Sequence, residues 1–380
     1  MHNETRVYLD NAATTKVRPE VFEAMRLVLC EEYGNPSSVH QEGLRARKLL
    51  EEARDSVACS LGAKPEEIFF TSGGTESDNW AIKGVLKQSD EKKRHVITSS
   101  IEHPAILRSC RQLENSGYKI TYLPVDKYGL VSPDSLAKAL TPDTALVSIM
   151  TANNEIGTIE PVSRLSAISR EHGVLFHTDA VQAVGNIPVD VSKLGIDLLS
   201  FSAHKFHGPK GTGGLYVQKG VKIAPLIDGG AQERKFRAGT ENLPGIIGMK
   251  EALALSVSEM KDTQFHIAKL RDLLITEVLA LVSDVKINGH PQDHLPGIVN
   301  LTFPGKDGER LLLMLNYEGF ACSGGAACSS SSSEVSHVLT SIGLSREEAK
   351  SSLRVSIGCM NTEDEIRQFV KALCRVLNNS

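Results

Sequence analysis

The sequence predicts an α/β protein: a large domain with a mostly parallel, seven-stranded sheet flanked by helices, followed by a smaller α+β domain. Short apolar runs alternate with helical patterns from about residue 65 to residue 220. Such alternation is typical of βαβ units, in which helices cover both faces of a parallel sheet. The chain has 380 residues, whereas a single hydrophobic core rarely serves more than ~250. A second, smaller domain is therefore expected.

Seven apolar runs in the first part of the chain have the length and composition of buried strands. They are residues 68–71, 96–98, 120–123, 145–149, 174–177, 197–201 and 214–217. Helices are expected between them; Pro104 opens and Gly117 closes one such pattern at 104–115. Because ligands of parallel α/β sheets bind at the carboxyl ends of the strands, the segments after these runs are the candidate sites.

A long helical stretch at 243–282 connects this sheet to the rest of the chain. The remainder mixes strand and helical patterns, as an α+β domain does. Its strands are expected at 298–301 and 352–356, and its helices at 308–317 and 362–377. We therefore place the large domain at residues 15–255 and the small domain at residues 1–14 and 256–380.

Composition and charge argue against several classes of protein. A formal net charge of -4 gives no reason to expect nucleic acid or an anionic membrane as a main partner. No apolar run approaches the ~20 residues that cross a bilayer, and no basic segment with an apolar run follows the first Met, so no signal peptide is expected. The seven cysteines are scattered without a C-x-x-C pair, which argues against disulfides and structural zinc. We expect a cytoplasmic protein without a bound metal.

A glycine-rich segment at 70–77 joins a predicted strand to a predicted helix. The backbone N–H groups around Gly74, the helix N-terminus and the Thr75 hydroxyl could together bind a phosphate. Taken alone, the segment is better explained as a plain turn with Thr75 as the helix N-cap. Ser202 and His204, in a later motif, could donate to the same phosphate. Their presence favours a phosphate-binding role for the glycine-rich segment.

Lys205 follows an apolar strand and precedes a Gly/Pro-rich turn, where side chains line a crevice. A buried setting near His204 and His207 would lower its pKa, so that its amine could condense with an aldehyde. Asp179, at the end of an earlier strand, could hold a protonated pyridine nitrogen, although a helix N-cap is the simpler role. Gln182 could reach a ring oxygen. A lysine and a carboxylate of this kind are what a pyridoxal phosphate enzyme needs.

Two further segments follow predicted strands. His103 could stack on the cofactor ring and move protons, or could be a structural histidine at a helix start. Asn154 could bind a ring hydroxyl or a substrate carboxylate, or could be a turn asparagine. A zinc hydrolase built on His103, His177 and Asp179 is possible by residue type, but these residues lack ligand spacing on one element.

With these motifs the chain resembles the cysteine desulfurases of the NifS/IscS type, in the class V aminotransferase superfamily with the pyridoxal phosphate fold type I. The matching segments run in family order over nearly the whole chain. They are residues 8–15, 33–38, 71–79, 102–103, 153–157, 177–182, 202–205, 237–240 and 352–356.

The resemblance implies a role for each matching position. Lys205 would hold pyridoxal phosphate and abstract the α-proton, Asp179 would pair with the pyridinium, and His103 would stack on the ring. Gln182 and Asn154 would contact the ring oxygen. The phosphate would be bound by Gly74, Thr75, Ser202 and His204. Thr240 would reach the partner subunit's phosphate, which implies a homodimer. Arg354, with Asn154, would hold the substrate carboxylate.

Cys328 matches the family's loop cysteine and lies in a Ser/Gly-rich run at 323–333. A thiolate there could take the sulfur from L-cysteine, giving alanine and a persulfide for an iron–sulfur scaffold or another acceptor protein. A buried free cysteine is the usual alternative, which we expect for the nearby Cys322. A selenocysteine lyase or another class V lyase or aminotransferase would share the cofactor residues. A non-catalytic sulfur carrier fits the intact Lys205 and Asp179 poorly.

Overall fold

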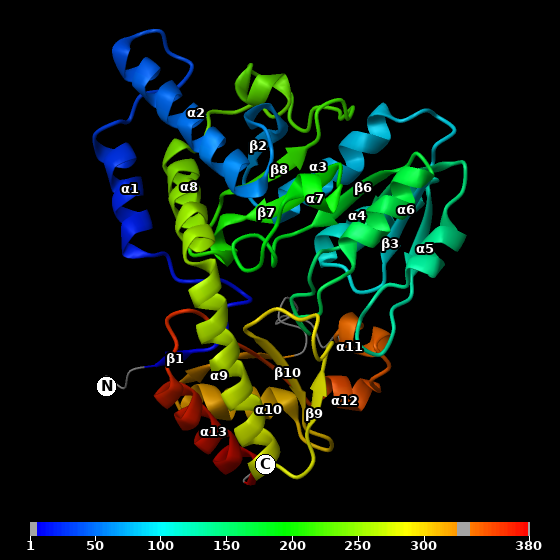
Figure 1. Cartoon of the computed structure of the whole chain (residues 1–380), viewed down its shortest axis with the longest axis vertical. Coiled ribbons are helices and arrows are strands. Elements are labelled where there is room, and N and C mark those ends of the chain that lie inside the picture. Colours follow the sequence, from blue (N-terminus) through cyan, green and yellow to red (C-terminus); the bar gives the residue numbers. More distant parts are fainter. Residues whose placement is uncertain (1–5, 325–334, 379–380) are drawn as a thin grey trace.

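The computed structural model describes residues 6–324 and 335–378, and a seven-stranded sheet forms the upper part of this region in Figure 1. The strand order is β2-β8-β7-β6-β5-β3-β4, and only the pairings of β8, with β2 and β7, are antiparallel. The predicted, mostly parallel sheet is therefore confirmed. Its strands are β2 (Ile68–Thr71), β3 (His95–Ser99), β4 (Lys119–Leu123), β5 (Thr144–Ser148), β6 (Leu175–Asp179), β7 (Leu198–Ser202) and β8 (Gly213–Val217).

Helices cover both faces of this sheet because its strands are apolar on both sides. In β2, Phe69 packs in one cluster with Trp80 and Ile106, whereas Ile68 and Phe70 pack in another with the helices on the opposite face. This alternation follows from the two-residue period of a strand. The helices of this part are α1 (Pro19–Cys30), α2 (Gln41–Leu61), α3 (Gly74–Gln88), α4 (Pro104–Asn115), α5 (Pro133–Ala139), α6 (Val162–Glu171), α7 (Val191–Leu194) and α8 (Leu243–Ser258).

A smaller sheet lies below the first in Figure 1. Its order is β12-β13-β10-β9 with antiparallel pairings, and β1 pairs with β11 in parallel beside it. Leu301 and Val355 of this sheet share an apolar cluster with Leu274 and Phe369 from the covering helices. The elements are β1 (Val7–Tyr8), α9 (Met260–Leu281), β9 (Lys286–Asn288), β10 (Ile298–Thr302), α10 (Gly308–Tyr317), β11 (Phe320–Ala321), β12 (Ser323–Gly324), α11 (His337–Ser341), α12 (Arg346–Lys350), β13 (Ser352–Ser356) and α13 (Glu363–Asn378).

The predicted helical stretch at 243–282 is two helices rather than one. Glu259 ends α8 and precedes α9, and its carboxylate accepts two hydrogen bonds from Arg18, at 2.6 and 3.0 Å. Figure 1 shows α8 beside the large sheet and α9 beside the small one. The proposed domain boundary at 255/256 lies close to this break and stays a prediction.

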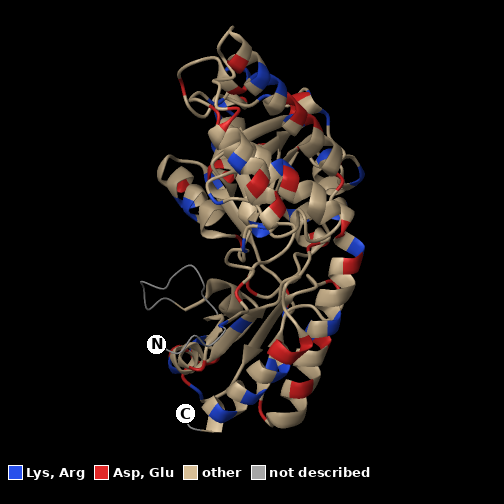
Figure 2. Cartoon of the chain, turned by 90° about the vertical axis from the view of Figure 1, so that its left-hand side faces the viewer, with Lys and Arg blue, Asp and Glu red and all other residues tan. Residues whose placement is uncertain are grey.

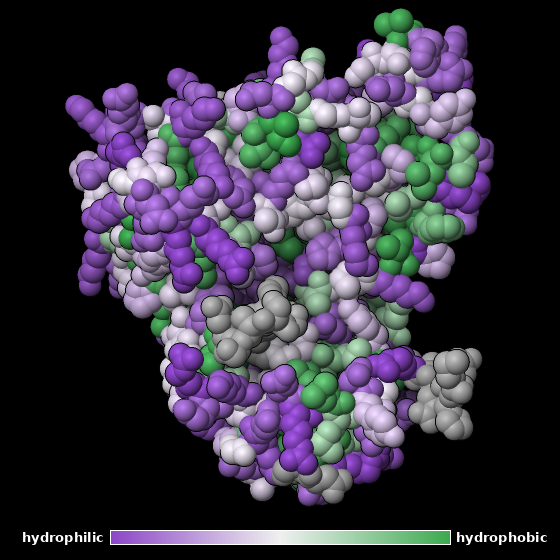
Figure 3. Space-filling model, turned by 180° about the vertical axis from the view of Figure 1, so that it is seen from behind, coloured by the Kyte–Doolittle hydropathy of each residue, from purple (hydrophilic) through white to green (hydrophobic). Residues whose placement is uncertain are grey.

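Charged and apolar side chains are distributed differently over the surface. On the face in Figure 2, Lys and Arg are intermingled with Asp and Glu among the described residues, as the small net charge suggests. Figure 3, in which α1 and α2 lie at the right, shows apolar side chains gathered on that side. Phe22 and Leu29 of α1, Leu44 of α2, and Tyr33 and Val39 between the two helices are exposed. Within the described residues, no helix is long and apolar enough to span a membrane.

Candidate functional site

The parallel strands β3, β5, β6 and β7 end at one edge of the large sheet, on the side of the small sheet. His103 follows β3, Asn154 follows β5, Asp179 ends β6 and Lys205 follows β7 in a short 3-10 helix (Ala203–Lys205). The topology therefore brings together His103 and Lys205, which are 102 residues apart in the sequence (205 − 103), and the candidates between them.

Lys205 is directed toward the N-terminal segment of the chain. Its Nζ donates to the carbonyl oxygens of Ala12 at 2.6 Å and Ala13 at 2.8 Å. Gln182 Nε2 donates to the same Ala12 oxygen at 2.9 Å. Lys205 and Gln182 also line one cavity, together with Ser356 of the small sheet. The site therefore lies where both sheets and the N-terminal segment meet.

The two histidines near the lysine are neutral. Burial, followed by the charges of Lys205 and Lys210, lowers the pKa of His204 to about 4. Burial also lowers the pKa of His207, whose Nε2 lies 3.4 Å from Cys359 Sγ. Neither imidazole therefore places a positive charge beside Lys205 at neutral pH.

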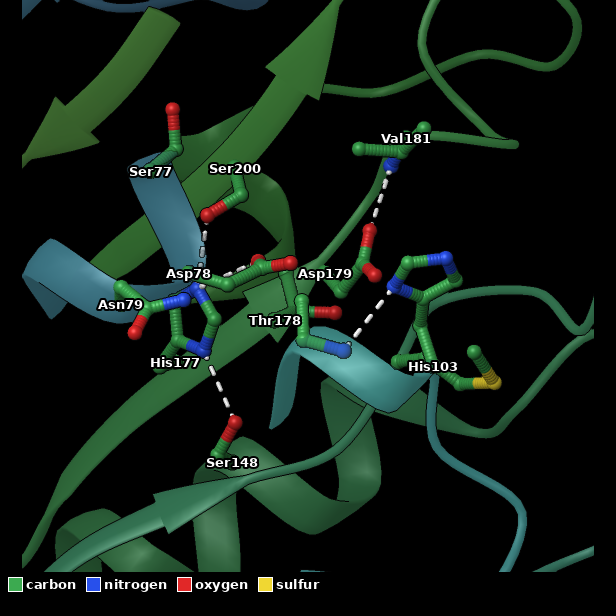
Figure 4. Close-up of polar contacts among 12 residues, drawn as sticks. Ser77, Asp78, Asn79, His103, Ser148, His177, Thr178, Asp179, Val181 and Ser200 are labelled. Atoms are coloured by element: carbon green, nitrogen blue, oxygen red, sulfur yellow. Dashed lines mark hydrogen bonds and ion pairs between the residues drawn. The ribbon is translucent and has the colours of Figure 1, made fainter. Parts of the chain in front are cut away.

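Asp179 is almost fully buried, and its Oδ1 accepts the Val181 N–H at 2.9 Å. Burial raises the pKa of this carboxyl, whereas the nearby His103 and Lys205 lower it. Figure 4 shows the His103 ring beside the Asp179 carboxyl. His103 also caps α4, because its Nδ1 accepts the Ala105 N–H at 3.2 Å. His103 therefore has the structural role of a helix N-cap, and in this position its ring still lies beside Asp179.

A polar network that the sequence did not predict lies behind Asp179 (Figure 4). His177 is fully buried, and its ring nitrogens contact Ser148 Oγ at 2.8 Å and Ser200 Oγ at 3.0 Å. Asp78 Oδ1 lies 3.8 Å from His177 Nε2. Burial, and then the charge of Asp179, raises the pKa of Asp78 well above its usual value. The sequence signal that could have found Asp78 was its position on α3, four residues after Gly74, because residues with that spacing lie on the same helix face.

The zinc alternative fits this network poorly. Burial lowers the pKa of His177 to about 3, so the ring is neutral, and hydroxyl groups occupy both of its nitrogens. Within residues 6–324 and 335–378, no group of three or more His, Cys, Asp or Glu is placed to hold a metal.

The predicted phosphate ligands lie together. A cavity of about 460 Å³ is lined by Gly74, Thr75, Ser202 and His204. The N-cap of α3 is Gly73, with φ +153°, and no side chain caps this end, so the alternative role of Thr75 as N-cap is wrong. The first N–H groups of a long helix have no partner within the helix and attract anions. This cavity therefore has hydroxyl and N–H donors suited to a phosphate.

Thr240 is not among the residues that line this phosphate cavity. It borders a neighbouring cavity of about 260 Å³, with Ser72, Gly211 and Arg237. Ser72 and Gly211 border both cavities, so they form the wall between them. The placement of Thr240 outside the phosphate cavity of its own chain is the one expected if it serves a second copy.

Arg354 and Asn154 are brought into contact from 200 residues apart. Arg354 Nη1 donates to the Asn154 carbonyl oxygen at 2.9 Å, and Nη2 donates to Asp10 Oδ1 at 2.8 Å. Arg354 is buried, and its Nε has no hydrogen-bond acceptor among the described residues. The turn role considered for Asn154 belongs to Asn153, whose Oδ1 accepts the N–H groups of Glu155 and Ile156. Asp10 lies in the matching segment 8–15, but no role was predicted for it from the sequence.

Two cysteines were distinguished by sequence. Cys328 lies outside the described residues, so its role stays a prediction. Cys322 packs against the apolar cluster of the small sheet, and burial raises the pKa of its thiol to about 12. The expected role of Cys322 as a core residue is thus supported, since its thiol stays protonated at neutral pH.

Comparisons with known proteins agree with this geometry. A family model described as aminotransferase class V matches residues 7–369. A cysteine desulfurase IscS from Methanosarcina thermophila is 53% identical over 371 residues, or 98% of this chain and 92% of that protein. One from Dictyoglomus turgidum is also 53% identical, over 98% of this chain and 94% of that protein.

Solved structures give the same assignment. A structure described as a NifS-like protein has a TM-score of 0.94 and 42% identity, and the match covers 99% of this chain and all of that one. A NifS-like protein from Rickettsia africae has a TM-score of 0.89 and 32% identity, over 98% of this chain and 99% of that one. The chain therefore belongs to the aminotransferase class V family, among the cysteine desulfurases of the NifS/IscS type.

Proposed function

We propose that this protein is a pyridoxal phosphate-dependent cysteine desulfurase, which converts L-cysteine to L-alanine and keeps the sulfur as a persulfide on Cys328. The observation that carries the proposal is the position of Lys205, which neighbours both the buried Asp179 and residues that line the cavity at the start of α3. It follows β7 at the sheet edge where the neighbouring β6 ends with the buried Asp179, and its charge opposes the burial that raises the pKa of that carboxyl. It directly follows Ser202 and His204, which line the cavity at the start of α3.

The residues present fit the cofactor. Asp179 would pair with the pyridine nitrogen and keep it protonated, and His103 would stack on the ring beside it. Gln182 and Asn154 would contact the ring oxygen. The phosphate would accept hydrogen bonds from the start of α3 at Gly74 and Thr75, and from Ser202 and His204. When bound, pyridoxal phosphate supplies an electron sink that weakens the bonds to the substrate Cα.

The remaining steps belong to the residues of the chain. Lys205 Nζ would hold the cofactor covalently through its aldehyde, and the free amine would take the proton from the substrate Cα and later return one to it. The Cys328 thiolate would attack the substrate sulfur. The bond from that sulfur to Cβ breaks, an S–S bond forms, and a proton completes the methyl group of alanine. One cysteine and one thiol thus become one alanine and one persulfide.

Arg354 is the proposed anchor for the substrate carboxylate. Its guanidinium already binds one carboxylate, that of Asp10, and its buried Nε is still without an acceptor. A guanidinium binds a carboxylate through two parallel hydrogen bonds, which fixes orientation as well as affinity. A substrate carboxylate would thus complete the hydrogen bonding of Arg354 and place Cα near Lys205.

Arg354→Lys is expected to raise KM for L-cysteine by roughly 10- to 100-fold, because the ammonium of lysine cannot form the paired hydrogen bonds. The change in kcat should be smaller. Steady-state kinetics with alanine detection measures both. Arg367→Lys, at the exposed ion pair with Glu277 on the small domain, is the matched control and should keep KM unchanged. An unchanged KM in Arg354→Lys would remove this residue from the substrate site.

We further propose that the protein is a cytoplasmic homodimer. Thr240 lines a cavity other than the phosphate cavity of its own chain, which suits a residue that serves the partner. The apolar side chains exposed on α1 and α2 in Figure 3 offer a surface that a second copy would cover. The persulfide would pass to an iron–sulfur scaffold or another sulfur-acceptor protein, without nucleic acid or membrane partners.

The alternative activity is that of a selenocysteine lyase or another class V lyase or aminotransferase. It would use the same cofactor residues but would not need Cys328. The two activities are separated by incubating the purified protein with L-cysteine. The expected products are alanine and a mass gain of one sulfur on the peptide that contains Cys328. Alanine without that mass gain would favour the lyase, and the absence of both would reject the desulfurase.

A further inference from the structure

The segment that leads to Thr240 has an unusual backbone. Glu233, Arg234 and Lys235 are three consecutive residues with positive φ, at 41, 57 and 70°. None of them is glycine, so their Cβ atoms make this left-handed conformation unfavourable. Strain of this kind persists only where the surrounding contacts hold it in place, and it is concentrated at functional sites.

A buried ion pair holds the segment at its start. The Glu233 carboxylate accepts hydrogen bonds from Arg54 Nη2 at 2.8 Å and Nη1 at 2.9 Å, and both side chains are almost fully buried. Glu233 Oε2 also accepts the Phe70 N–H at 2.9 Å, and Arg54 Nη1 donates to the Ile68 carbonyl at 3.0 Å. The pair therefore joins α2, β2 and the strained segment.

A second ion pair holds the segment nearer to Thr240. Arg237 Nε and Nη2 donate to the Glu76 carboxylate at 2.8 and 3.3 Å. Glu76 lies in the first turn of α3, and it also accepts the N–H and the hydroxyl of Ser72. Phe70 and Glu76 lie on either side of the glycine turn that forms the phosphate cavity. The strained segment is thus fastened at its start to Phe70 of β2, which lines the Thr240 cavity, and beyond its end to Glu76, which lines the phosphate cavity.

We propose that Arg54 and Glu233 are a positioning pair that holds the Thr240 segment against the outer wall of the phosphate cavity and presents Thr240 to a second copy of the chain. This inference rests on the proposed function, since it needs the dimer with shared sites. A buried carboxylate that serves only to build a core could be exchanged for an apolar pair. Here the carboxylate also holds a strained backbone, at residues 233–235, that lies five to seven residues before the Thr240 hydroxyl.

The test compares two ligands that differ only in the phosphate. Pyridoxal 5'-phosphate and pyridoxal both carry the aldehyde that Lys205 needs, but only the first can reach Thr240. Thr240→Ala and Glu233→Gln are each expected to lower the affinity for pyridoxal 5'-phosphate about tenfold, which corresponds to the loss of one hydrogen bond to a charged group. The double variant should bind pyridoxal 5'-phosphate at most about twofold more weakly than either single variant, because both changes remove the same contact. Pyridoxal affinity should stay within about twofold of the unsubstituted protein throughout.

Glu241→Gln is the matched control, because it is the same substitution next to Thr240 and should leave both affinities unchanged. Circular dichroism and the melting temperature check the fold, and Arg54→Lys replaces Glu233→Gln if that variant does not fold. The inference would be overturned if the two single-variant losses of pyridoxal 5'-phosphate affinity add up in the double variant, or if pyridoxal affinity falls by the same factor. Either result would make the pair merely structural. An effect of Thr240→Ala without one of Glu233→Gln would also overturn it. No effect of Thr240→Ala would instead reject the shared site of the proposed function.

Discussion

Lys205→Ala is expected to abolish cysteine desulfurization, with a loss in kcat/KM of at least ~10⁴-fold, because the side chain supplies both the covalent attachment and the proton transfer. General base catalysis alone contributes roughly 10²- to 10⁴-fold, and the attachment to the cofactor is lost with it. Alanine formation from L-cysteine measures the activity. Reduction with borohydride, followed by mass spectrometry of the peptide with residue 205, measures the covalent attachment directly.

Lys205→Arg tests whether activity is lost because the reactive amine is missing or because the fold is disturbed. The guanidinium keeps the positive charge and the hydrogen bonds to the Ala12 and Ala13 carbonyls, which Lys205 makes at 2.6 and 2.8 Å. It stays protonated at any accessible pH, so it neither attacks an aldehyde nor accepts the α-proton. We therefore expect Lys205→Arg to fold as the unsubstituted protein does and to be as inactive as Lys205→Ala. Turnover by either variant would assign the chemistry to another residue.

The strands of both sheets could be predicted because their signals are local. Buried strands such as 68–71 and 352–356 are continuous apolar or mixed runs between turn residues, and both have the predicted bounds in the structure. The helix at 104–115 was fixed by Pro104 and by the glycine that follows its end. The break between α8 and α9 was missed, because Glu259 is a helix-compatible residue. Its partner Arg18 lies 241 residues away, so no local pattern marks the contact.

The candidate site was predictable where one strand end carries one functional residue. Asp179 is the last residue of β6 and Lys205 comes shortly after β7, and the shared edge of a parallel sheet brings them together. Side chains that act through tertiary pairing were not predictable. Asp10 binds Arg354 across 344 residues, and Asp78 lies behind Asp179 only because α3 packs on the sheet there. The choice between Thr75 and Gly73 as N-cap depends on a backbone angle, which residue type alone does not decide.

Cys328→Ala is expected to keep cofactor binding and to lose persulfide formation and sulfide release by at least ~1,000-fold, because the nucleophile that takes the sulfur is removed. The proposed residues for the cofactor and the substrate carboxylate, Lys205, Asp179 and Arg354, are left intact. Addition of L-cysteine should therefore still change the visible absorption of the cofactor in this variant. Sulfide release in the presence of a thiol reductant, together with alanine formation, measures the loss.

Cys322→Ala is the matched control for this loss. Cys322 lies six residues before Cys328 in the sequence, but burial raises the pKa of its thiol to about 12, which leaves almost no thiolate at neutral pH. A thiol attacks sulfur only as the thiolate, so we expect Cys322→Ala to retain near-normal desulfurization. Activity retained by Cys328→Ala would favour the lyase alternative. Activity lost only in Cys322→Ala would move the persulfide to Cys322, and it would then require that thiol to leave the apolar cluster against which it packs.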